Sequence, residues 1–164
     1  MKRFSIPLVL ALATLSLLAA STPAQAGERP IHAAGRGALN APDFFASGAL
    51  YGSGKGEHLG RCGLFIPLDF DELWRHGTLD TQYLQLGAAS GDQLFATVDS
   101  EFDPATGILA GTITFAGGTG RFADASGSAR LLIVPDTSWF YYSHVPYPID
   151  GTLFSWALEG TIDY

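Results

Sequence analysis

Hydrophobic and polar residues alternate with a period of two along most of the chain beyond residue 30, which is the repeat of a β-strand. In the run 151–163, the bulky residues Phe154, Trp156 and Ile162 fall on one face, and the opposite face is more polar. Turn residues recur about every ten positions, a spacing typical of all-β sandwiches and barrels. We expect strands at about 31–38, 45–52, 57–68, 81–89, 93–102, 107–116, 127–135, 139–145 and 151–163.

The connections between these runs carry turn signals of their own. Ser90-Gly91-Asp92 predicts a tight hairpin, and the segment 103–107 predicts a second one because its proline and glycine suit a turn. One short helix is expected at about 70–76, where Asp69 can cap the first turn, Glu72 can reach back and Gly77 can end it.

About eight short antiparallel strands, each with one apolar face, can close on themselves and so remove their exposed edges. The pattern therefore predicts an all-β fold, an antiparallel eight-stranded closed barrel with one short helix, in preference to a sandwich. We assign the barrel domain to 45–164 and expect the preceding segment, 27–44, to be irregular. A barrel of this strand number holds either packed side chains or one small ligand.

The first 26 residues have the composition of a cleaved signal peptide. Lys2 and Arg3 precede an apolar run at 6–20, and Ala24-Gln25-Ala26 supplies small residues for cleavage. A membrane anchor is the alternative, but the run is shorter than the roughly 20 residues that a spanning helix needs, and no basic flank follows it. We therefore expect an exported chain, periplasmic or secreted, that begins at Gly27 and has no stable membrane anchor.

Charge and cysteine content narrow the classes of partner. Without Lys2 and Arg3 the chain keeps 7 basic and 16 acidic residues, a net charge near −9, which disfavours nucleic acid and anionic lipid surfaces. Cys62 is the one cysteine, so the fold does not depend on a disulfide. Its thiol is either buried and inert or usable, and burial is the more common state of a free cysteine.

Four ordered motifs carry a family resemblance. The stretch 117–127 reads GGTGRFADASG between two expected strands, and EHLGR at 57–61, AASGD at 88–92 and GTIDY at 160–164 accompany it. Together they resemble the exported bacterial branch of the allene oxide cyclase and dirigent barrel superfamily over roughly 57–164. Ser90 stands where that pattern would have asparagine. The structural motif comprises Gly117, Gly118, Gly120, Phe122 and Gly127.

The resemblance implies an eight-stranded barrel with a central pocket, often trimeric in the plant members, so a homo-oligomer is expected. Those plant proteins cyclise a fatty-acid epoxide or steer the coupling of phenoxy radicals, mainly by confining a reactive apolar molecule. We expect glycines of the motif to let Phe122 fold inward and plug one barrel end, with Arg121 at the rim.

Two functions remain open. The barrel could bind a small apolar or aromatic molecule and steer its cyclisation or coupling, or it could be a non-catalytic exported structural or protein-interaction module with a filled interior. Inward side chains that leave no room favour the module, whereas a cavity above about 300 Å³ with converging polar groups favours ligand binding. The ligand-pocket candidates are His58, Cys62, Tyr83, Arg121 and Tyr141, and His58 and Cys62 are also the catalytic candidates.

The candidates rest on different arguments. Strand alternation places His58 and Cys62 on the inward face of 57–68, where a histidine could move a proton or simply bond to backbone. The other three candidates come from the resemblance. An aromatic cluster formed by Trp139, Phe140, Tyr141, Tyr142 and Tyr147 could be a barrel wall or lid, or a mouth that stacks a flat ligand.

Other motif-like patterns predict no cofactor and no metal. The letters G-x-G-x-x-A at 118–123 match a dinucleotide loop, but no helix follows them. Asp99, Glu101 and Asp103 lack the glycine that a calcium loop needs, because Pro104 stands there, and they are better explained as an acidic outer face. The four histidines show no metal-ligand spacing.

Overall fold

The structure is a computed structural model that describes residues 27–43, 47–78, 82–103, 105–136, 141–142, 145–146 and 151–164. Within these ranges, the side chains at 42, 43, 74, 82, 141, 142, 145 and 146 are not described. Among the described residues no helix combines the length and apolar character needed to cross a membrane.

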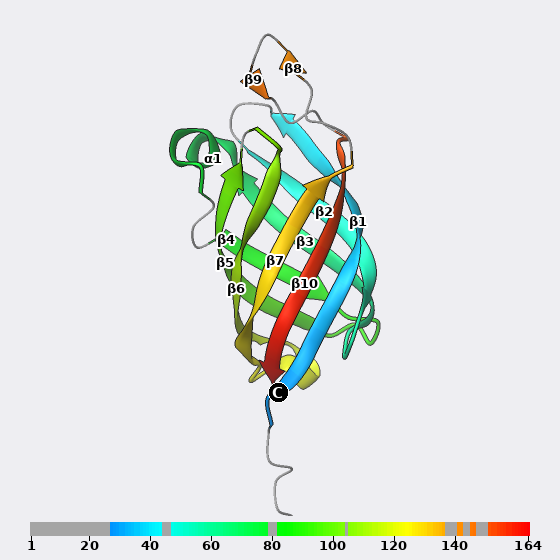
Figure 1. The fold of residues 1–164 in the computed structure, drawn as a ribbon. Helices are drawn as coiled ribbons and strands as arrows, with labels where there is room; N and C mark the ends of the chain where they lie inside the picture. Colours follow the sequence, from blue (N-terminus) through cyan, green and yellow to red (C-terminus); the bar gives the residue numbers. More distant parts are fainter. Residues whose placement is uncertain are drawn as a thin grey trace, which may run out of the picture.

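Eight antiparallel strands close into a barrel in the order β1-β10-β7-β6-β5-β4-β3-β2, as predicted (Figure 1). The barrel strands are β1 (Arg29–Asp43), β2 (Ser47–Gly56), β3 (Gly60–Asp69), β4 (Gln82–Gly87), β5 (Gln93–Asp103), β6 (Ile108–Gly118), β7 (Ser126–Pro135) and β10 (Leu153–Asp163). The barrel closes where β10 pairs with β1, with Arg29 opposite Ile162 and Ala38 opposite Leu153. No edge of the sheet is left open among these eight strands.

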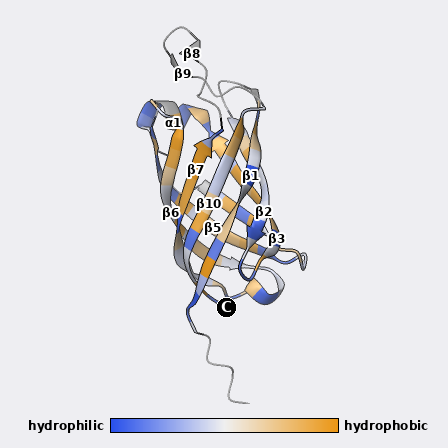
Figure 2. Cartoon of the chain, turned by 45° about the vertical axis from the view of Figure 1, so that its right-hand side comes forward, coloured by the Kyte–Doolittle hydropathy of each residue, from blue (hydrophilic) through white to orange (hydrophobic). Residues whose placement is uncertain are grey.

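The period-two pattern sorts side chains between the inside and outside of the barrel. Along β5, Leu94, Ala96, Val98, Ser100 and Phe102 are buried, and the residues that alternate with them are exposed or half-buried. Figure 2 shows hydrophobic and hydrophilic residues interspersed along the strands, as this sorting requires. The buried residues form one hydrophobic core that runs through the barrel.

Strand β1 contains the expected strand 31–38 but extends beyond it, so most of the segment 27–44, expected to be irregular, is regular strand. It pairs with β10 from Arg29 to Ala38 and with β2 from Ala33 to Asp43. Its inward positions include Gly35 and Gly37, and a Cβ at Gly37 would lie 2.4 Å from Cζ of Phe154. The strand lacks a strong hydrophobic pattern because aromatic side chains from elsewhere occupy the space beside it.

The two ends of the barrel are built differently. Helix α1 (Phe70–His76) lies at one end, and the 3₁₀ turn η1 (Gly120–Phe122) lies at the other (Figure 1). As predicted, the Asp69 carboxylate caps α1, accepting hydrogen bonds from the backbone N–H groups of Asp71 (2.9 Å) and Glu72 (3.2 Å), and Gly77 ends it with φ of 69°.

Two expected strands differ from the prediction. The expected strand 139–145 corresponds in the described residues to β8 (Tyr141–Tyr142) and β9 (Val145–Pro146), a small separate sheet. The expected strand 57–68 begins only at Gly60, because residues 57–59 form the hairpin turn with φ of 61° at His58. Gly91, with φ of 90°, serves the predicted β4–β5 hairpin.

Candidate functional site

Large side chains fill the middle of the barrel. Phe154 and Trp156 of β10 are almost completely buried and point into the core. A Cβ at Gly52 would lie 2.7 Å from Nε1 of Trp156, so the glycines of β1 and β2 provide the space that these rings occupy. The interior is therefore a packed core over the barrel's mid-section, and the central pocket that the resemblance implies is filled by side chains.

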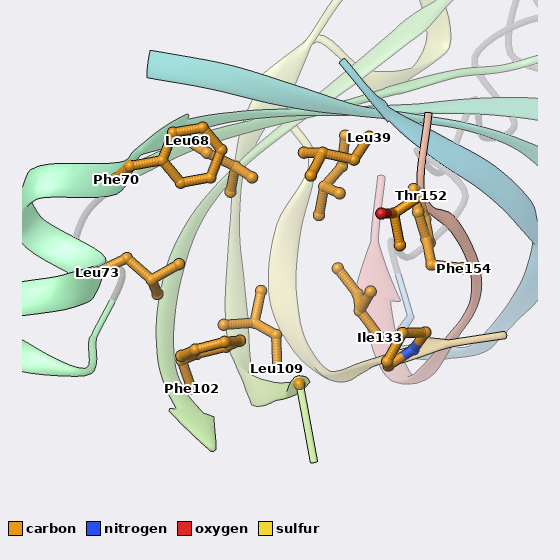
Figure 3. Close-up of a pocket in the computed structure, with 12 residues that line it drawn as sticks. Leu39, Leu68, Phe70, Leu73, Phe102, Leu109, Ile133, Thr152 and Phe154 are labelled. Carbon is orange, nitrogen blue, oxygen red and sulfur yellow. The ribbon is translucent and has the colours of Figure 1, made fainter. Parts of the chain in front are cut away.

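The remaining hollow lies at the α1 end, and we call it the α1-end pocket (Figure 3). It is bounded by Leu68 of β3, Phe70 and Leu73 of α1, and Leu109 and Phe154 from the opposite wall, with Leu39, Leu50, Phe102, Gly107, Ile133, Pro135 and Thr152 completing it. The enclosed cavity is about 30 Å³, room for one or two water molecules. With its open mouth included, the hollow spans about 440 Å³.

The local sequence explains why α1 covers this end. Asp69 both ends β3 and caps the helix, so the chain turns sharply across the barrel opening. Phe70 and Leu73, three residues apart, then face the barrel together and are buried. A Cβ at Gly48 would lie 2.8 Å from the Phe70 ring, which shows how closely the helix approaches β2.

The lining of the α1-end pocket limits its chemistry. None of the twelve lining residues carries an ionisable side chain, and Thr152 supplies the single side-chain hydroxyl. Such a surface can exclude water and hold an apolar group, but it offers no general acid, general base or metal ligand.

The η1 end is sealed by the glycine motif, as the sequence predicts. Phe122 is 0% exposed, and its ring meets the Tyr164 ring edge-on at a centroid distance of 5.0 Å. Gly117 and Gly120 have φ of 82° and 56°, which allow the turn that brings Phe122 inward. The motif therefore closes the barrel, with Arg121 left at the rim.

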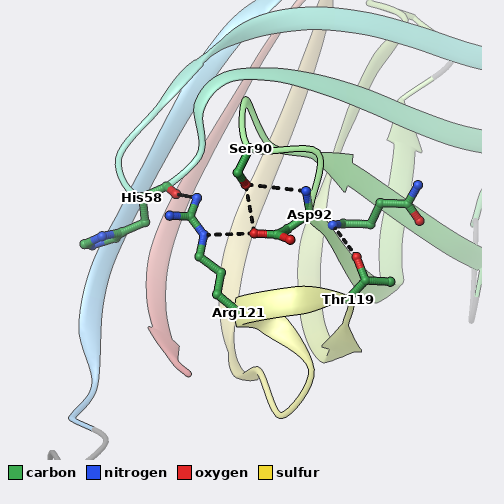
Figure 4. Close-up of polar contacts among 6 residues, drawn as sticks. His58, Ser90, Asp92, Thr119 and Arg121 are labelled. Atoms are coloured by element: carbon green, nitrogen blue, oxygen red, sulfur yellow. Dashed lines mark hydrogen bonds and ion pairs between the residues drawn. The ribbon is translucent and has the colours of Figure 1, made fainter.

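A polar network ties three loops together at this end (Figure 4). Arg121 donates from Nη2 to the backbone oxygen of His58, and its Nε lies 3.7 Å from a carboxylate oxygen of Asp92. The Ser90 hydroxyl donates to Asp92 at 2.8 Å, and Thr119 Oγ1 accepts from the backbone N–H of Gln93 at 2.9 Å. Because these side chains are turned toward loop backbone, the network fixes loop positions.

The structure does not bring the predicted site residues together. His58 sits in the β2–β3 turn, where its Nε2 lies 3.1 Å from the Pro30 oxygen, and it meets Arg121 only through backbone. Cys62 faces inward and is 6% exposed, and burial raises the pKa of its thiol. Tyr83 lies on the outer wall, 44% exposed. Tyr141 belongs to β8, and its side chain is outside the described set, as is most of the aromatic cluster.

Three buried polar atoms without a partner in the part of the chain that the structure describes, Ser100 Oγ, Trp156 Nε1 and Asp163 Oδ1, were missed by the sequence reasoning. The Ser100 hydroxyl, on a residue that is 2% exposed, and Nε1 of Trp156 have no hydrogen-bond partner among the described residues. The strand pattern carried the signal for Ser100, since it lies between the inward residues Val98 and Phe102. Because all three atoms are buried without a hydrogen-bond partner in the described ranges, each lowers the stability of the fold.

The described part of the chain contains no group of three or more histidine, cysteine, aspartate or glutamate side chains arranged to hold a metal ion. Asp99, Glu101 and Asp103 alternate with buried residues on β5 and face outward. Comparisons with protein-family models, with curated proteins and with solved structures found no match to this chain.

Proposed function

We propose that this protein binds one small, neutral, apolar or aromatic molecule in the α1-end pocket. The observation that carries the proposal is the lining: aliphatic and aromatic side chains from α1 and seven barrel strands converge on one hollow with no charged group among them. The enclosed cavity of about 30 Å³ is well below the volume of a typical small-molecule site, so a ligand would have to enter through the open mouth and displace side chains that line it.

Burial of apolar surface sets the expected strength of binding. A ring system of the size of an aromatic side chain buries roughly 150–250 Å². At about 25 cal/mol per Å² this is worth about 4–6 kcal/mol before the cost of association. Before that cost, this free energy corresponds to dissociation constants of about 1 mM to about 40 μM, so the affinity should be no tighter than tens of micromolar, and selectivity should follow shape.

The resemblance to allene oxide cyclase and dirigent barrels supports a ligand of this class, as those proteins hold reactive apolar molecules. For this chain we propose binding, with any steering of cyclisation or coupling arising from confinement, because the α1-end pocket supplies no acid or base. We further propose that the mature chain begins at Gly27 and works outside the cytoplasm, which the mass of the protein recovered from its native host would test.

A titration with N-phenyl-1-naphthylamine, a neutral apolar fluorophore, tests the proposed site. Thr152→Trp places a bulky ring at the half-buried rim of the pocket and should weaken binding at least tenfold. Leu153→Trp is the matched control, since the next residue along points outward and is 56% exposed. Its affinity should equal that of the unmodified protein.

Mass spectrometry of an organic extract of the natively purified protein would supply the ligand itself. One apolar compound, enriched over an extract of an unrelated protein purified in the same way, is the expected result. An empty extract, together with probe binding that is absent or identical in the two tryptophan variants, would refute the proposal.

A second candidate function is supported by the packed mid-section of the barrel. With Phe154 and Trp156 filling the interior, the barrel can serve as a rigid, non-catalytic module that presents its outer surface to a partner. An empty extract, together with binding of a partner protein to the outer surface of the barrel, would favour this candidate.

A further inference from the structure

A groove crosses the outer wall of the barrel over β2, β3 and β4, and we call it the outer groove. Cross-strand register defines it: Tyr51 pairs with Phe65, Ser53 with Gly63, and Lys55 with Arg61. All six side chains alternate with inward residues, so the three rows lie side by side outside the barrel. The aromatic row and the cationic row form two walls, and Ser53, Gly63 and Gly87 form the floor between them.

Two hollows that share Gly63 and Gly87 make this groove continuous. One, of about 710 Å³, extends toward Lys55 and Arg61, and the other, of about 340 Å³, extends toward Tyr51 and Phe65. Both are open to solvent along the wall, and neither reaches the α1-end pocket.

The floor glycines have no structural reason to be glycine. A Cβ at Gly87 would meet nothing within 4 Å, and a Cβ at Gly63 would meet only the Gly52 backbone oxygen, at 3.8 Å. Neither residue has positive φ. By contrast, a Cβ at Gly54 or Gly160, also within strands, would lie 2.2 Å from a backbone oxygen. Glycine weakens a strand, and glycines of this kind mark places where a ligand approaches the backbone closely.

The cationic wall carries a second local cost. Lys55 and Arg61 stand directly opposite each other on the same face, and like charges in that position are destabilising. Neither has an ion-pair partner among the described residues, although the chain is strongly acidic overall. Two adjacent local costs on one surface are typical of a functional site.

The aromatic wall offers ring faces at a fixed spacing. The Tyr51 and Phe65 rings lie 5.2 Å apart, and Tyr51 is 52% exposed. A second pair of aromatic rings lies on the other side of β4, where Gln85 pairs with both Phe65 and Phe95. In this pair the Tyr83 and Phe95 rings lie 5.3 Å apart. Two strand spacings separate the two pairs of rings, about 10 Å.

We propose that the outer groove binds an acidic glycan, a polysaccharide that carries uronate carboxylates. Sugar rings would stack on the Tyr51 and Phe65 faces, and carboxylates would pair with Lys55 and Arg61. The glycine floor lets the chain of sugars lie close to the strand backbone, where the Gln85 amide can bond hydroxyl groups. An open groove suits a long chain that adds contacts along its length, whereas a small molecule needs enclosure.

Binding of short oligogalacturonates, followed by calorimetry and by amide chemical shifts, tests this proposal. We expect saturable binding, weakened by salt, with shift changes at Gly63 and Gly87. A neutral cello-oligosaccharide should bind more weakly by on the order of tenfold, because it lacks the carboxylates that pair with the two cations.

Variants on the groove and away from it provide the controls. Gly87→Val should fill the floor. Because a Cβ at this position would meet nothing within 4 Å, we expect the protein to keep its stability and lose binding on the order of tenfold. The double variant Lys55→Gln with Arg61→Gln should remove the preference for the acidic glycan. Arg130→Gln, an exposed arginine on the outer face of β7, should change nothing.

Several outcomes would overturn the proposal. These are absent binding, equal affinity for the acidic and neutral oligosaccharides, unchanged affinity in Gly87→Val, or tighter binding of single-stranded DNA. Sedimentation in which Gly87→Val dissociates an oligomer would also overturn it, because a second copy of the chain would then occupy the groove. Thr152→Trp should leave glycan binding intact, which separates this site from the α1-end pocket.

Discussion

Replacing Phe122 with alanine should remove the plug at the η1 end of the barrel. The ring is 0% exposed, packs against Tyr164 at 5.0 Å and lies 4.7 Å below the Arg121 guanidinium carbon. Truncation of a buried phenylalanine costs about 3–5 kcal/mol, which includes the cavity that remains. The ring pair contributes about 0.5–1.5 kcal/mol beyond burial, so the upper half of that range is expected.

The free energy lost in Phe122→Ala is large compared with the total free energy of unfolding. A domain of this size is stable by about 5–15 kcal/mol, so Phe122→Ala should remove about a third of the free energy of unfolding or more. At roughly 4 °C per kcal/mol, the melting temperature should fall by about 16–20 °C. Phe122→Leu keeps most of the buried volume and should lose much less, because a smaller cavity remains.

Urea unfolding followed by tryptophan fluorescence measures the free energy directly. We expect the midpoint to fall while the dependence on urea concentration stays the same, since the packed fold is retained. A loss below about 1 kcal/mol for Phe122→Ala would refute the reasoning. It would mean that the η1 end can collapse or open freely, so the glycine motif would need a role other than closing the barrel.

Three further predictions concern single side chains. Cys62 should resist iodoacetamide in the folded protein and react fully in urea, because burial raises its pKa; rapid native labelling would contradict this. Hydrogen bonds from the Thr106 hydroxyl and a backbone N–H lower the pKa of Asp103. The stability that the Asp103 carboxylate contributes is therefore present above about pH 4 and is lost as pH falls through the lowered pKa. Thr106→Ala should raise the pKa of Asp103 in a carboxyl NMR titration, and an unchanged pKa would contradict this prediction. Ser100→Ala should raise the free energy of unfolding by up to about 1–2 kcal/mol, while the exposed Ser128→Ala should not; a loss would show that the hydroxyl has a partner.

The barrel could be predicted because its strands are amphipathic and its turns have local chemistry. In β10 the inward residues Phe154, Trp156 and Ile162 are all bulky, so the pattern is clear without structural knowledge. The cap at Asp69 and the glycine at Gly77 likewise mark α1 by interactions within a few residues. Features set by short-range contacts were therefore predicted correctly.

The full length of strand β1 was obscured by packing between distant residues, although its middle, 31–38, was expected as a strand. Its inward glycines leave room for Phe154, which lies more than a hundred positions later in the sequence. A glycine that accommodates a distant ring looks the same in the sequence as a glycine in a loop. Only the closed barrel, which brings β1 beside β10, distinguishes the two.

The position of His58 shows a related limit of the sequence pattern. His58 was placed on the inward face by extending the alternation of β3 backwards, but the hairpin takes up residues 57–59 and ends that alternation. Positive φ at a histidine is uncommon, so the sequence gives little warning of such a turn. The α1-end pocket joins side chains from α1 and seven strands, a grouping that depends on the order of the strands.

The strand glycines of this barrel fall into two groups: those that the packing of the fold requires and those that it does not. At Gly37, Gly52 and Gly160 a side chain would collide with the neighbouring strand or with a core ring, so packing alone explains the residue. At Gly63 and Gly87 a side chain would point into open space, and a residue of higher β-propensity would stabilise the strand. Because the fold gains nothing from glycine at these two positions, contact with something outside the barrel is the physical reason that remains, and the outer groove is where that contact should be sought.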